Sequence, residues 1–140
     1  MTKAAPDALQ TALAAEHAAV FVYGALGGQT SQSSNPALYG EITDAYVTHR
    51  ARRDDLIVMI EADGLEPVAA EPGYELPADL STATAVADRA LAIERSCAAT
   101  YAFVVGSTRG GERKWALEAL LDAAVRELAF GGTPERLPGL

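Results

Sequence analysis

Three ionisable side chains of this sequence are placed to do chemistry: Glu16, His49 and Glu94. Each lies in the middle of a segment whose apolar residues recur at steps of three and four. Drawn as α-helices, these segments place each side chain within about 40° of the apolar stripe. Carboxylates and imidazoles are ligands for divalent metals such as iron and manganese. Since a buried, unpaired carboxylate costs several kcal/mol, each of these side chains needs a buried partner.

Two kinds of partner remain open. A metal ion is one, with these three side chains as its ligands. An internal cation is the other, because Arg53 lies one turn beyond His49 and only about 40° from it around the helix. The hydroxyl groups of Tyr23, Tyr46 and Tyr101 can donate hydrogen bonds to the carboxylates as well. The sequence predicts a buried polar network made of Glu16, Tyr46, His49, Arg53, Glu94 and Tyr101.

Simpler interpretations of single residues stay open beside this network. Glu16 and Glu94 can be surface glutamates, and His49 can be a core histidine held by hydrogen bonds. His17 lies on the flank of its helix and is expected to contact a neighbouring helix or solvent. Cys97 is expected to be a small core residue, and as the one cysteine it forms no internal disulfide.

Four helices are predicted to position these side chains, at about residues 7–26, 36–63, 82–105 and 112–129. Asp7 begins a capping box at the start of the first helix, and Gly27 is expected to end it. Asn35, with a proline after it, predicts the start of the second helix. Ser81 or Thr82 is expected to cap the third helix.

The fourth helix has an apolar face of its own, which is expected to pack into the core. That face consists of Leu117, Leu121, Val125 and Leu128. Asp122 points about 100° away from the middle of this face, so it is not expected to reach the centre of the bundle.

Loop lengths select the topology. Residues 65–80 carry three prolines and are predicted to form a long connection between the second and third helices. About 17 extended residues span roughly 55 Å, which exceeds the roughly 40 Å length of the second helix. The other two connections are short, so they join antiparallel neighbours. The prediction is an all-α four-helix bundle with one long crossover, forming a single domain over residues 1–140 with an irregular tail.

Composition narrows the function. The alanine-rich chain carries a formal net charge of −8 with a pI near 4.6, which disfavours binding to nucleic acid or to an anionic membrane surface. The N-terminal segment lacks the long apolar stretch of a signal peptide, so a cytoplasmic location is expected. The glycine-rich segment 106–111 lacks the spacing and the lysine of a phosphate-binding loop, and no catalytic residue is predicted.

Several stretches resemble the ferritin-like superfamily, and more closely an uncharacterised bacterial family of small ferritin-like domains. They are AEHAAVFVYG (15–24), THRARRDDLI (48–57), YELP (74–77) and the ERSCAATYAFV stretch from Glu94. The resemblance implies a ferritin-like four-helix bundle. It also implies a di-metal site with one Glu from each of the first and third helices, and a Glu-x-x-His motif from each of the second and fourth.

The sequence matches half of that ligand pattern. Glu16 and Glu94 match the single glutamates, while the second helix reads Tyr46-x-x-His49. The fourth helix offers no histidine. The favoured interpretation is therefore a ferritin-like domain with a degenerate di-metal site, no cofactor, and a binding or structural role. The alternative is an iron- or manganese-dependent oxidoreductase that uses Glu16, His49 and Glu94. A homodimer is a candidate assembly, and no partner protein is identified.

Overall fold

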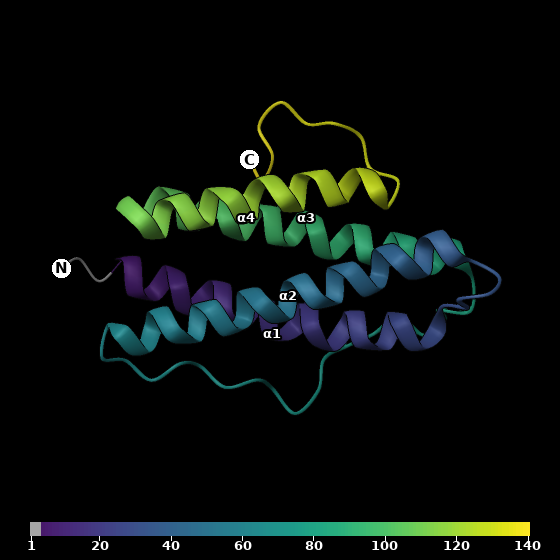
Figure 1. The fold of residues 1–140 in the computed structure, drawn as a ribbon, viewed down its shortest axis with the longest axis horizontal. Helices are drawn as coiled ribbons and strands as arrows, with labels where there is room; N and C mark the ends of the chain where they lie inside the picture. Colours follow the sequence, from purple (N-terminus) through teal and green to yellow (C-terminus); the bar gives the residue numbers. More distant parts are fainter. Residues whose placement is uncertain (1–3) are drawn as a thin grey trace.

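Four α-helices make up the computed structural model, which describes residues 4–140. They are α1 (Ala4–Gln29), α2 (Pro36–Ala62), α3 (Ala83–Ser107) and α4 (Gly110–Ala129), and no strand occurs in this range (Figure 1). The prediction of four helices in an all-α chain is confirmed.

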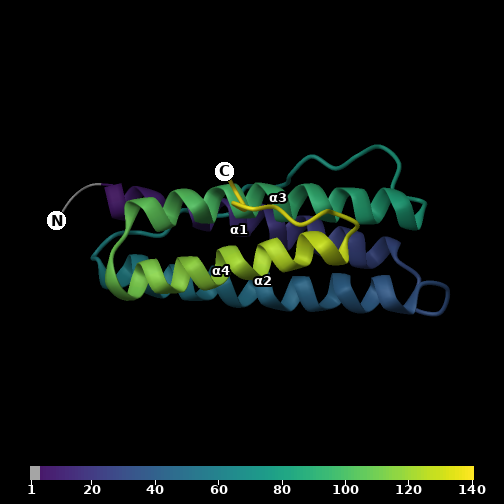
Figure 2. The same cartoon turned by 90° about the horizontal axis from the view of Figure 1, so that it is seen from above.

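The long connection lets α2 and α3 run in the same direction. Residues 63–82 leave the end of α2 and return along the length of the bundle before α3 begins (Figures 1 and 2). α1 packs against α2 and α3, and α3 packs against α4. This is the arrangement that the loop lengths predicted.

Two side chains of α1 make hydrogen bonds to the backbone of the crossover, residues 63–82. The Gln10 amide donates to the carbonyl oxygen of Glu66 and accepts from the backbone N–H of Val68, each at 2.8 Å. His17 Nε2 lies 2.9 Å from the carbonyl oxygen of Val68. The predicted flank contact of His17 is therefore made with the crossover rather than with another helix.

Helix ends follow the predicted signals in part. Thr82 caps α3, because its hydroxyl accepts from the backbone N–H of Ala85 at 3.1 Å. Asn35 occupies the N-cap position of α2, although its side chain makes no capping hydrogen bond. The prediction that Asp7 caps α1 was wrong, because α1 begins at Ala4 and Asp7 lies within its first turn. Gly27 does not end α1 either, and the helix continues through it to residue 29.

The orientation of α4 differs from the prediction. Its inward face consists of Ala116, Ala119 and Ala123, with two charged residues beside them, and the predicted apolar face points away from the bundle. The prediction of Leu117, Leu121, Val125 and Leu128 as core residues was therefore wrong. Small alanine side chains line the inward face of α4, and the two charged residues beside them pair with partly or mostly exposed side chains, Arg126 with Asp44 and Asp122 and Glu127 with Arg95. Large apolar residues are therefore not needed on the inner side.

The irregular tail lies against α3 through a glycine. Gly139 has a φ of +83°, and a Cβ built on it would lie 2.3 Å from the carbonyl oxygen of Ala98. No L side chain fits this approach without movement of the tail or of α3. Within residues 4–140, none of the helices combines the length and the apolar composition needed to cross a membrane.

We expect Gly139→Ala to release the tail and to lower the free energy of unfolding by about 1 kcal/mol, because the new Cβ meets backbone and the positive φ strains an alanine. Hydrogen exchange of residues 133–140 and thermal melting measure the two effects. Gly73→Ala is the matched control, since nothing lies within 4 Å of a Cβ there. Equal behaviour of the two variants would contradict the docked tail.

Candidate functional site

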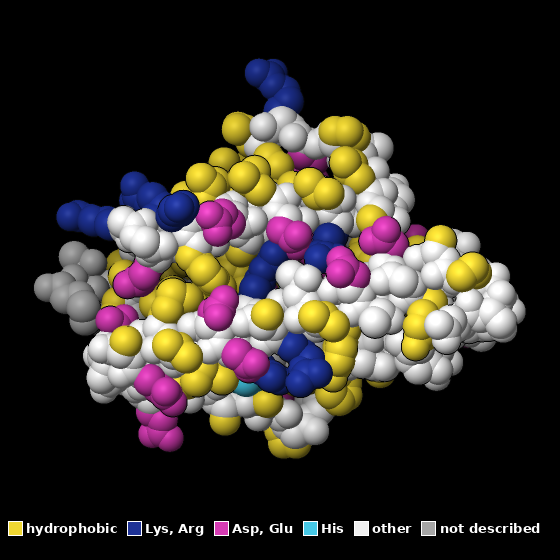
Figure 3. Space-filling model, in the orientation of Figure 1, with side chains coloured by type: hydrophobic (Ala, Val, Ile, Leu, Met, Phe, Trp, Pro, Cys, Tyr) yellow, Lys and Arg dark blue, Asp and Glu magenta, His cyan; other side chains and the backbone are white. Residues whose placement is uncertain are grey.

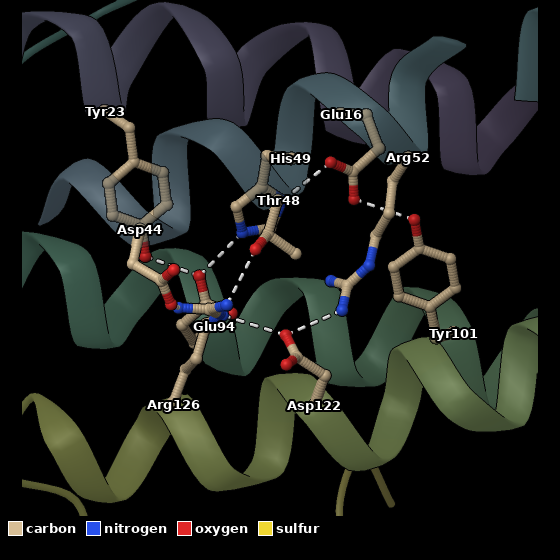
Figure 4. Close-up of polar contacts among 10 residues, drawn as sticks. All are labelled: Glu16, Tyr23, Asp44, Thr48, His49, Arg52, Glu94, Tyr101, Asp122 and Arg126. Carbon is tan, nitrogen blue, oxygen red and sulfur yellow. Dashed lines mark hydrogen bonds and ion pairs between the residues drawn. The ribbon is translucent and has the colours of Figure 1, made fainter. Parts of the chain in front are cut away.

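A histidine held between two glutamates occupies the centre of the bundle (Figure 4). His49 of α2 directs Nδ1 to Glu16 Oε2 of α1 at 2.6 Å and Nε2 to Glu94 Oε2 of α3 at 2.8 Å. All three side chains have no exposed surface. The structure thus brings together the three ionisable residues that the sequence places inside apolar stripes.

Two tyrosines extend this arrangement into a chain of five residues. The Tyr101 hydroxyl donates to Glu16 Oε1 at 2.7 Å, and the Tyr23 hydroxyl donates to Glu94 Oε2. The Tyr23 ring also stacks on the imidazole of His49, with 5.2 Å between ring centres. Both rings are buried. The chain therefore reads Tyr23, Glu94, His49, Glu16 and Tyr101, and it joins α1, α2 and α3.

The two glutamates favour the protonated form of the histidine in this chain. Burial alone would lower the pKa of His49, but its hydrogen bonds to Glu16 and Glu94 and their negative charges outweigh burial and raise the pKa to about 9. Burial and the charge of Glu94 raise the pKa of Tyr23, while burial and the charge of Glu16 raise that of Tyr101. The centre is therefore an imidazolium between two carboxylates, with neutral phenols as outer donors.

Arg52, not Arg53, is the arginine beside this centre. Arg52 is 8% exposed, its Nη2 lies 2.6 Å from Asp122 Oδ2, and its guanidinium lies 5.6 Å from the centre of the Tyr101 ring. The side chain of Arg53 is 26% exposed and pairs with its neighbour Asp54. The prediction of Arg53 was wrong because the two arginines lie on either side of His49, about 100° apart around α2. Asp122 of α4 lies on the side of Arg52.

Asp122 joins two arginines in a polar seam between α2 and α4, formed by Arg52, Asp122 and Arg126. It accepts from Arg52 at 2.6 Å and from Arg126 Nε at 2.8 Å, and Figure 4 shows it between the two guanidinium groups. Arg126 also bonds Asp44 at 3.0 Å and Thr48 at 2.8 Å. Burial would raise the pKa of Asp122, but the two arginines hold it below its ordinary value. Sequence reasoning missed this seam, although the four-residue spacing of Asp122 and Arg126 was a signal for it.

Tyr46 is not part of the central chain. It is partly buried and makes no hydrogen bond to either glutamate; its ring lies under the guanidinium of Arg50, 5.5 Å away, and close to Gly24. The prediction of Tyr46 in the network was therefore wrong. Tyr23 of α1 occupies the position at the glutamate instead, where its hydroxyl donates to Glu94.

The residues present do not fit a dinuclear metal site. Such a site needs carboxylate and imidazole ligands from the fourth helix, whereas α4 sends Arg126 and an arginine-paired Asp122 to this region. A single metal ion would find more ligands here than a dinuclear centre would. One ligand atom each from Glu16, His49 and Cys97 lie within 4.8 Å of one another, and all three residues are buried. Among residues 4–140, the buried Oε1 of Glu94 has no hydrogen-bond partner.

Comparison with known proteins places this geometry in a family. A conserved hypothetical protein, rv2844, from Mycobacterium tuberculosis has a similar crystal structure, with a TM-score of 0.81 and 34% sequence identity over 91% of this chain and 87% of that chain. No curated protein was found to match the sequence. The model of the family described as "Domain of unknown function (DUF4439)" matches residues 8–140. The chain therefore belongs to the DUF4439 family.

Proposed function

We propose that this protein is a ferritin-like domain whose dinuclear metal centre has been replaced by a charge-balanced polar core, and that its role is binding or structural. The observation that carries the proposal is the position of His49. Its two ring nitrogens both contact carboxylates, at 2.6 and 2.8 Å, so the imidazole occupies the space between the two glutamates that would be ligands of a metal ion.

Charge balance supports the same conclusion. Glu16 and Glu94 bring two negative charges into a region without solvent, and an uncompensated pair would be strongly unfavourable. The imidazolium of His49 offsets one of them. Arg52 supplies a second positive charge, which also pairs with Asp122. Burial would lower the pKa of Arg52, but the neighbouring Tyr101, Glu16 and Asp122 raise it. His49 and Arg52 thus supply, from the protein itself, positive charge close to the two glutamates.

The ferritin-like part of the proposal rests on topology and on the placement of the inward residues. A single long crossover between α2 and α3 is the connectivity of ferritin-like bundles. Glutamates from the first and third helices and a histidine from the second point to one centre, which is half of the ligand pattern of that superfamily. The missing half is replaced by the seam of Arg52, Asp122 and Arg126.

We expect purified protein to contain less than one equivalent of iron, manganese or zinc per chain, because the imidazole of His49 already occupies the position between the two carboxylates and contacts one oxygen of each. Elemental analysis of protein purified without chelator measures this directly. The melting temperature should also be unchanged when a chelator is added, since no metal would contribute to stability. Two bound metal ions per chain would contradict the proposal.

A mononuclear metal centre is the second candidate function, favoured by the approach of Glu16, His49 and Cys97 and by the unpartnered Oε1 of Glu94. In it, Glu16, His49 and Glu94 hold one iron or manganese ion of an oxidoreductase, and the thiol of Cys97 is a further ligand. One bound ion, with an absorption band that disappears in Glu16→Ala, would favour this candidate. A band that persists in Glu16→Ala would place the ion elsewhere.

A further inference from the structure

The outer face of α4 is apolar along most of its length. Four large aliphatic side chains are exposed there, and we call them the α4 stripe: Leu117 (44%), Leu121 (56%), Val125 (65%) and Leu128 (45%). They fall within an arc of about 80° around the helix. Figure 3 shows hydrophobic side chains in a row along α4, beside the polar seam with α2. Contiguous apolar patches on a surface mark interaction sites more often than single exposed residues do.

α4 therefore exposes its large apolar residues to solvent and turns small and charged residues towards the bundle. Its inner face carries Ala116, Ala119 and Ala123 together with two charged residues, Arg126 and Glu127, that are 8% and 3% exposed. A monomer in water gains by burying its largest aliphatic residues and exposing its charges, and α4 does the opposite on both faces. Burial of the stripe against another chain would remove the exposed half of this contradiction.

We propose that a second copy of this chain covers the α4 stripe, with the two α4 helices packed antiparallel about a twofold axis. This assembly goes beyond the proposed function and does not depend on the state of the His49 centre. In a twofold interface the same patch is used by both copies, so each residue must face a suitable counterpart.

The spacing of the stripe meets this condition. An antiparallel pair centred between Leu121 and Val125 places Leu117 against the partner's Leu128, and Leu121 against the partner's Val125. Because the stripe advances in steps of four, four and three residues, its side chains stay on one face of each helix, as in antiparallel helix pairs with small crossing angles. Each large aliphatic side chain therefore meets another one.

Charge selects the antiparallel orientation. Lys114 is exposed and lies in line with the stripe, one turn before Leu117. In the antiparallel pair it faces the C-terminal end of the partner's α4, where the helix dipole is negative. A parallel pair would instead bring two copies of Lys114 together, which is repulsive.

The oligomeric state tests this interface. Light scattering of the intact chain should give twice the 14.6 kDa chain mass, and Val125→Glu should shift the protein to monomer. Val58→Glu on α2 is the matched control, because Val58 is also a valine and is also 65% exposed, and it should remain dimeric. Leu121→Glu is the second stripe variant, in case Val125→Glu fails to fold by circular dichroism. A monomeric wild-type chain, dimeric stripe variants or a monomeric Val58→Glu would each overturn the proposal.

Cysteine cross-linking tests the orientation. On mild oxidation, the double variant Leu117→Cys/Leu128→Cys should form a disulfide-linked dimer, because the two positions face each other across an antiparallel pair. Each single variant should stay largely uncross-linked, and the buried Cys97 serves as an internal background in all samples. Efficient cross-linking of Leu117→Cys alone would indicate a parallel pair and would overturn the antiparallel arrangement.

Discussion

Replacing His49 by phenylalanine is expected to lower the free energy of unfolding at neutral pH by about 3–5 kcal/mol, the largest effect of any single substitution in the central chain. The phenyl ring is planar, as imidazole is, and can still stack on Tyr23, although it is the larger ring. What is lost is the cation. Glu16 and Glu94, both without exposed surface, would each keep only a tyrosine donor and would repel one another. Urea unfolding of the variant and the wild type measures the difference.

A compensated variant separates charge from packing. In Glu16→Gln/His49→Phe/Glu94→Gln the carboxylates are replaced by neutral amides of the same shape, so much of the lost stability should return. His17→Phe is the matched control, because His17 is only partly buried and contacts the crossover backbone, and it should cost less than about 1 kcal/mol. If His49→Phe were no more harmful than His17→Phe, the imidazolium could not be the element that balances the core.

Periodicity in the sequence was enough to find the centre because the signal is local. Glu16, His49 and Glu94 each interrupt an apolar stripe of their own helix, and a polar residue inside such a stripe is conspicuous whatever the neighbouring helices do. The same is true of Thr82, whose capping role depends only on the residues that follow it. Features of this kind are set within one helix and can be predicted before the packing is known.

The choice between Arg52 and Arg53 depends on packing between helices. Both arginines lie within about 60° of His49 around α2, one on each side. Only the position of α4 decides which side is buried, because Asp122 supplies the counter-charge there. The error over Tyr46 has the same origin, since the neighbouring α1 presents Gly24 to its ring and Tyr23 to the glutamate.

The error over α4 has a different cause. A sequence pattern of large aliphatic residues indicates a face that is buried, but it does not say whether the burial occurs within one chain or between two. Leu121 and Val125 carry the pattern of a core and are more than half exposed in the single chain. The prediction of burial within the chain was wrong, and burial against a second copy is what the proposed dimer would add.

The free energy of unfolding is expected to fall by about 3 kcal/mol as the pH rises from 6.5 to about 9, which is the second large effect of the same centre. The pKa of His49 is raised from its ordinary 6.5 to about 9 in the folded protein. Between these values the folded chain keeps the proton of His49 and the unfolded chain loses it. The stabilisation is thus complete below pH 6.5 and is lost as the pH passes through about 9. Urea unfolding at intervals across this range measures it.

His49→Phe isolates the contribution of His49 to this pH dependence. In the variant the free energy of unfolding should no longer fall between pH 6.5 and 9, while the loss of stability at higher pH should remain. Those later losses come from Tyr23 and Tyr101, whose pKa values are raised above the ordinary 10, because burial and the adjacent glutamates keep them neutral when unfolded tyrosines ionise. The wild type should therefore lose stability in two stages and the variant in one. In the wild type the ring of His49 should titrate near pH 9 by NMR. Two results would contradict this prediction: an imidazole ring that titrates below pH 7, or a free energy of unfolding that does not change up to pH 9. Either would show that His49 is neutral between the two glutamates, and the charge-balanced core would then have to be abandoned.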